Sequence, residues 1–138
     1  MPQKAMPQKT ERNHLVALAA ALLAIQVIHG AIPAETDAEG YVGLVGGLIL
    51  LVASITALVG LVQGTPWAPK LLGVTGLTVA VGFVLYHALP FHSPATNPYF
   101  GEDKIWLAQC TPVVLCVVIG LWAAWETLRP EPASTAHA

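Results

Sequence analysis

The sequence predicts an all-α integral membrane protein, a bundle of four transmembrane helices with both termini in the cytoplasm. The chain has 138 residues, of which 55% are hydrophobic and only 10% are charged. Soluble domains carry about 25% charged residues, so this composition does not suit a water-exposed surface. Four long apolar runs divide the chain, and positive charges gather on alternate segments between them. The length suffices for one compact bundle and leaves no room for a second domain.

The apolar runs give the four helices in order, at residues 15–32, 42–62, 71–89 and 105–128. Each run is close to the roughly 20 residues that an α-helix needs to cross a hydrocarbon core of about 30 Å. Glu126, in the last turn of the fourth run, is the one Asp, Glu, Lys or Arg within them. Because lipid offers no hydrogen bonds to a free backbone, apolar runs of this length form helices.

The first run also has a second interpretation, as a signal peptide that is cleaved after Ala34. Such peptides have an apolar stretch of about 7–15 residues, and this run is longer. Ile32 would lie three residues before the cut, where small residues are preferred. We therefore expect residues 15–32 to remain as the first transmembrane helix.

The positive charges predict the orientation. The segments before the first run, between the second and third, and after the fourth contain Lys4, Lys9, Arg12, Lys70 and Arg129. The other two connecting segments contain one cation, Lys104, among five acidic residues. By the positive-inside rule, both termini lie in the cytoplasm and both acidic loops face outward. The net charge of −2 argues against nucleic acid as a partner.

The polar ends of the chain are expected to lie outside the bundle. We expect residues 1–12 to form a disordered, basic cytoplasmic lead, 13–129 the membrane domain, and 130–138 a disordered tail. The tetrapeptide MPQK occurs at residues 1–4 and again at 6–9. Translation from Met1 and translation from Met6 therefore both remain open.

Small residues recur at helical spacing within the runs. The pairs are Ala17-x-x-x-Ala21, Ala20-x-x-x-Ala24, Gly43-x-x-x-Gly47 and Gly76-x-x-x-Ala80. In lipid, helices associate through close backbone approach at such positions. We expect these faces to pack inside the chain. The alternative is that one of them meets a partner subunit.

Histidines mark the outer end of the predicted bundle. His29 lies four residues before Pro33, and His87 lies three residues before Pro90, so both reach a similar depth. His92 follows the second proline and can fold back over the same end. Gln26 precedes His29 by three residues and therefore shares its helix face. The weaker candidate ligands near this end are Cys110, Glu35 and Glu39.

Three kinds of ligand suit this set. His29 and His87 could hold a haem b iron axially, or bind zinc or copper together with His92, Cys110 or a carboxylate. His29, His87 and Gln26 could instead contact a quinone head group. The structural interpretation is that the histidines only cap helix ends. Within one helix there is no His-x-x-x-His pair, and the chain has no Cys-x-x-Cys motif.

These observations favour a non-enzymatic role. A proton-coupled exporter needs a carboxylate in the middle of a span, and Glu126 lies at the end of one. No nucleophile with an evident base and no phosphate-binding loop is present. We therefore expect a small subunit or accessory protein of a larger assembly in a bacterial plasma membrane. The alternative is a metal-, haem- or quinone-binding protein for redox chemistry or metal handling.

Overall fold

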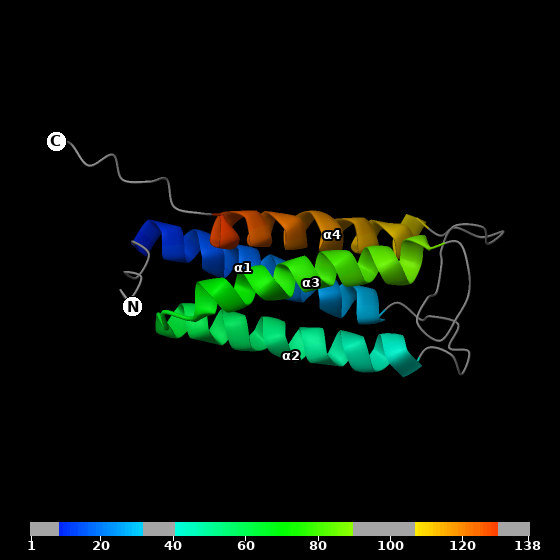
Figure 1. Ribbon diagram of the computed structural model, residues 1–138, viewed down its shortest axis with the longest axis horizontal. Helices are drawn as coiled ribbons and strands as arrows, with labels where there is room; N and C mark the ends of the chain where they lie inside the picture. The colour runs from blue at the N-terminus through cyan, green and yellow to red at the C-terminus, as the bar shows by residue number, and fades with distance from the viewer. Residues whose placement is uncertain (1–8, 32–40, 90–106, 130–138) are drawn as a thin grey trace.

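The computed structural model describes residues 9–31, 41–89 and 107–129, and these form four α-helices and one tight turn (Figure 1). The helices are α1 (Lys9–Ala31), α2 (Tyr41–Gln63), α3 (Ala68–Ala88) and α4 (Leu107–Leu128). All four are long and apolar enough to cross a membrane. The predicted all-helical fold with four candidate spans is confirmed.

α1 starts earlier than expected, at Lys9 instead of residue 15. Residues 9–12 therefore belong to the helix, although we expected them to be part of a disordered lead. Lys, Glu and Arg are good helix formers, and Glu11 in the first turn interacts favourably with the positive end of the helix dipole. Residues 1–8 and 130–138 lie outside the described part of the chain.

The helices alternate in direction, so α1 and α3 end where α2 and α4 begin (Figure 1). Here this is called the histidine end, because His29 and His87 lie in the last turns of α1 and α3. Each helix packs against its two neighbours around the bundle, and the α3–α4 interface is the most extensive. α1 also touches α3 across the diagonal, whereas α2 and α4 make no contact within the described residues.

The turn between α2 and α3 is a Schellman motif that requires a glycine. Gly64 has a φ of 73°, a left-handed conformation that side chains disfavour. Its amide donates to the Leu61 carbonyl at 3.1 Å, and the Thr65 amide donates to the Gly60 carbonyl at 2.8 Å. A proline in the first turn of α3 fits this start, because the first helical amides have no partner within the helix. The turn makes α2 and α3 antiparallel neighbours.

Close backbone contact joins α3 and α4. A Cβ atom added to Gly76 would lie 2.6 Å from the Gly120 carbonyl oxygen and 3.0 Å from the Ala123 Cβ. A Cβ at Gly120 would collide with the Gly76 carbonyl and lie 3.4 Å from the Ala80 Cβ. The expectation that Gly76-x-x-x-Ala80 packs inside the chain is therefore confirmed.

The other small-residue pairs behave differently. A Cβ at Gly43 would come within 2.5 Å of the Tyr86 ring, but Gly47 has no neighbour within 4 Å. The four alanines of the α1 pairs are all exposed: Ala17, Ala20, Ala21 and Ala24. Our expectation that these alanines pack internally is wrong. The bundle faces of α1 are occupied instead by larger side chains such as Leu18, Leu22 and Ile25.

We predict that Gly76→Ala destabilises the bundle by about 1–3 kcal/mol, because the added methyl group overpacks a backbone contact. Gly47→Ala is the matched control and should change stability by about 0.5 kcal/mol or less, since nothing lies near its Cβ position. Unfolding of each purified variant in a denaturing detergent series, followed by circular dichroism, measures both. Equal stabilities of the two variants would contradict the close α3–α4 contact.

Candidate functional site

The imidazoles of His29 and His87 are in direct contact at the histidine end. Their ring centroids are 5.2 Å apart, and the rings meet edge to face at 79°. The two residues come from α1 and α3, which run in the same direction across the diagonal of the bundle. The sequence placed the two histidines at the same end. Their contact follows from the touching of α1 and α3.

Two aromatic side chains of α3 complete a group that we call the histidine cluster: His29, Phe83, Tyr86 and His87. The Phe83 ring lies 4.8 Å from His29 and 5.7 Å from His87, measured between centroids. The Tyr86 ring meets His87 edge to face at 4.9 Å. On its other side, Tyr86 lies against Gly43 of α2, where no side chain intervenes.

Sequence reasoning missed Phe83 and the contact of Tyr86 with His87. The missed signal for Phe83 was its spacing of four residues before His87, which places the two side chains on one face of a helix. No local signal connects Gly43 to Tyr86, because that contact joins two helices.

The two histidines of the cluster are largely removed from solvent. His87 is only 5% exposed. Nδ1 of His29 is buried and has no hydrogen-bond partner within the described residues. A buried polar atom without a partner loses its hydration without compensation, at a cost of about 1–3 kcal/mol. Such an atom is rare in native structures and favours a ligand or a water molecule at this position.

Gln26 shares a helix face with His29 but contacts a different helix. Its amide nitrogen donates to the Ser54 hydroxyl of α2 at 2.7 Å and to the Leu22 carbonyl at 3.1 Å. Both Gln26 and Ser54 are buried. The pair therefore joins α1 to α2 inside the bundle, one turn below the histidine cluster.

A pocket of about 240 Å³ lies between α3 and α4 beside the cluster. His87 and Cys110 both line it, so the structure brings this cysteine to the same site. Cys116, by contrast, is fully buried, and both cysteines are free thiols. The remaining lining side chains are apolar: Phe83, Val84, Ala88, Val113, Val114, Val117 and Val118.

Within the described residues, the candidate metal ligands that lie together are the imidazoles of His29 and His87. Within the described segments, no group of three or more His, Cys, Asp or Glu side chains lies close enough together to bind a metal. Two imidazoles on one tetrahedral zinc ion place their ring centres about 5 Å apart, given nitrogen–metal bonds of roughly 2 Å. The observed 5.2 Å fits that spacing. The other candidate ligands, His92, Glu35 and Glu39, lie outside the described residues.

Haem fits the pair less well. Axial ligation puts the two imidazoles on opposite faces of a porphyrin, so the rings do not touch one another. Here the rings touch, and Phe83 packs against both. A haem between His29 and His87 would require α1 and α3 to move apart.

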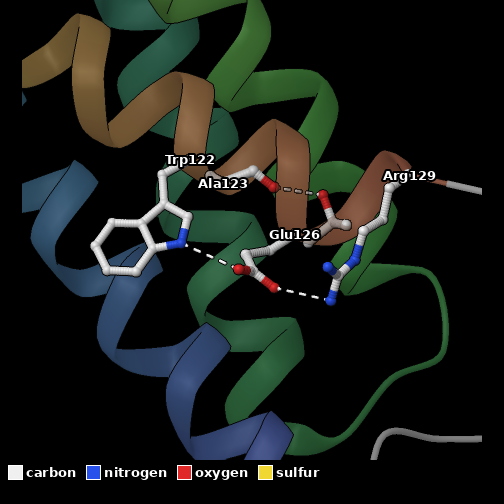
Figure 2. Close-up of polar contacts among 5 residues, drawn as sticks. Trp122, Ala123, Glu126 and Arg129 are labelled. Atoms are coloured by element: carbon white, nitrogen blue, oxygen red, sulfur yellow. Dashed lines mark hydrogen bonds and ion pairs between the residues drawn. The ribbon is translucent and has the colours of Figure 1, made fainter.

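Glu126 lies at the opposite end of the bundle, in a surface network on α4 (Figure 2). Its carboxylate accepts a hydrogen bond from the Trp122 indole at 3.2 Å and pairs with Arg129 at 3.4 Å. The Trp122 ring also lies 5.7 Å from His14 of α1. The Glu126 carboxylate therefore makes its contacts at the surface of α4 and not in the interior of the bundle.

Searches of protein-family models, of curated proteins and of solved structures found no match to this chain. Its functional interpretation therefore depends on the geometry of its own residues.

We predict that Ser54→Ala lowers stability by about 0.6 kcal/mol, because the buried Gln26 amide loses an acceptor on the neighbouring helix. Thr56→Ala is the control, since the Thr56 hydroxyl is exposed and bonds only to the Val52 carbonyl of its own helix. Detergent unfolding of both variants measures the difference. A Ser54→Ala protein as stable as Thr56→Ala would show that this contact does not hold α1 to α2.

Proposed function

We propose that this chain is a small, non-enzymatic subunit or accessory protein of a larger assembly in a bacterial plasma membrane, with both termini in the cytoplasm. This role is supported by the composition of the α1 surface that faces away from the bundle. Along the middle of that helix, every exposed side chain is an alanine: Ala17, Ala20, Ala21 and Ala24.

The other three helices present large side chains at the same depth. Exposed residues in the middle of α2 include Leu48, Ile49 and Val52, and α3 and α4 expose Val81 and Val118 among others. In a membrane, these large side chains would contact lipid tails. The alanines of α1 are short, so another helix could approach the α1 backbone closely.

Small side chains serve a particular purpose in a membrane. Since lipid tails are as apolar as leucine, helices gain little from hydrophobic burial and associate through close packing. Inside this chain, close backbone contact is made by Gly76 of α3 and Gly120 of α4. We infer that the alanine face of α1 meets a transmembrane helix of another subunit.

The test is photocrosslinking in native membranes. A photoreactive amino acid at position 20 or 24 should give one discrete adduct with a second polypeptide, which mass spectrometry then identifies. The same group at Val52, which is exposed on α2, should give lipid adducts only. In a second step, Ala20→Leu with Ala24→Leu should reduce the complex at least about tenfold, because two bulky groups block the close approach. The matched control is Val52→Leu with Val81→Leu.

Two outcomes would contradict the proposal. The first is the absence of any discrete adduct at positions 20 and 24. The second is an adduct with another copy of this same chain, which would make α1 a self-association surface.

A second candidate function has its own supporting observation. The spacing of 5.2 Å between the His29 and His87 rings and the unpartnered Nδ1 of His29 suit two ligands of one zinc or copper ion. In this role the protein would hold a metal ion at the outer face of the membrane.

We expect the purified protein, carrying no histidine tag, to retain about one equivalent of Zn²⁺ or Cu²⁺ after dialysis, measured by elemental analysis. His29→Ala and His87→Ala should each reduce this content to background, because each removes one of the two ligands. His14→Ala, at the opposite end of the bundle, is the control and should bind as wild type. Equal metal content in all variants would exclude this site.

A further inference from the structure

We call the end of the bundle opposite the histidine end the charged end, because all Lys, Arg, Asp and Glu side chains of the described residues lie there. They are four cations and two carboxylates: Lys9, Arg12, Lys70, Arg129, Glu11 and Glu126. The Glu126 carboxylate already accepts a hydrogen bond from Trp122 and pairs with Arg129 (Figure 2). The charged end therefore carries a surplus of positive charge.

A shallow groove of about 640 Å³ lies on α4 at the charged end. Its lining residues are Leu121, Trp122, Ala124, Trp125, Leu128 and Arg129. The exposed wall is almost wholly apolar, so it suits a hydrocarbon chain and not a polar group. Trp122 and Trp125 are 49% and 66% exposed, and exposed tryptophans are enriched where lipid head groups meet the hydrocarbon core.

The starts of α1 and α3, the two helices that pack against α4, lie next to this groove. On the α1 side, the His14 ring lies 5.7 Å from the ring of Trp122, measured between centroids. On the α3 side, a Cβ atom added to Gly73 would lie 2.7 Å from Cγ of Leu128. Because Trp122 and Leu128 both line the groove, cations in the first turns of α1 and α3 lie near it.

Lys9 and Lys70 are such cations, and both are exposed. A lysine near a membrane surface strengthens the binding of anionic lipid by roughly fivefold. An apolar groove next to surplus positive charge matches a molecule that has a hydrocarbon chain and a negative head group. We propose that the groove binds one anionic phospholipid. Its acyl chain lies against the two tryptophans, and its phosphate stays outside the groove, attracted by the cations of the charged end.

This inference goes beyond the proposed assembly role, because it uses the end of α4 and not the alanine face of α1. It does rest on the proposed membrane location, but the two can fail separately. A purified chain that stays soluble without detergent would contradict the membrane location. A chain that needs detergent and binds anionic and zwitterionic phospholipids equally well would contradict this inference alone.

The test is native mass spectrometry of the delipidated full chain in detergent, titrated with phosphatidylglycerol or with phosphatidylcholine of the same acyl chains. We expect one phosphatidylglycerol to bind at least about tenfold more tightly than phosphatidylcholine, because two or more cations attract it. Lys9→Gln with Lys70→Gln should remove most of this difference and leave phosphatidylcholine binding unchanged. Trp125→Ala should weaken the binding of both lipids at least about fivefold, because it removes one wall of the groove.

Trp67→Ala is the matched control, because Trp67 is 49% exposed at the same end of the bundle and does not line the groove. It should bind both lipids as wild type. If a variant does not give a folded, monodisperse protein, the comparison of the two lipids on the wild-type chain decides. The proposal fails if the wild-type chain binds both lipids equally, or if Trp125→Ala and Trp67→Ala behave alike. It also fails if inorganic phosphate competes as well as phosphatidylglycerol, which would indicate a site for free anions.

Discussion

The close approach of α3 and α4 at Gly76 and Gly120 is the constraint on which the rest of this bundle depends. Neither residue has a side chain, so the two helix backbones approach closely. Among the described glycines, these two are the ones whose Cβ positions meet the backbone of a neighbouring helix. In lipid, where hydrophobic burial drives helix association only weakly, such contact is a main source of stability. It fixes α3 and α4 as a pair, against which α1 and α2 pack.

The same two helices form the pocket at the histidine end. Small residues stand where α3 and α4 meet in the middle of the bundle. One or two turns further along the helices, the larger side chains of Phe83 and Val117 line the pocket. The space that remains is bounded on the α3 side by His87, whose ring is fixed by His29 from across the diagonal. His87 thus belongs both to the histidine pair and to the wall of the pocket.

The polar groups are used in distinct ways along the bundle. Gln26 and Ser54 satisfy each other and bind α1 to α2. Glu126 and Arg129 pair at the surface of the opposite end of the bundle. The histidine cluster differs from both, because it contains a buried ring nitrogen without a partner.

The sequence alone determined the number of helices, their approximate bounds and the placement of both histidines at one end. It could do so because long apolar runs in lipid form α-helices, and because prolines mark where helices end. It did not determine which face of each helix points inward. The alanine pairs of α1 and the Gly76–Ala80 pair of α3 have the same four-residue spacing, yet only the α3 pair lies at an interface inside the described bundle. In a membrane both the interior and the surroundings are apolar, so hydrophobicity does not distinguish the two faces. The packing of the four helices also decided three further features: the contact of Tyr86 with Gly43, the hydrogen bond of Gln26 with Ser54, and the pocket.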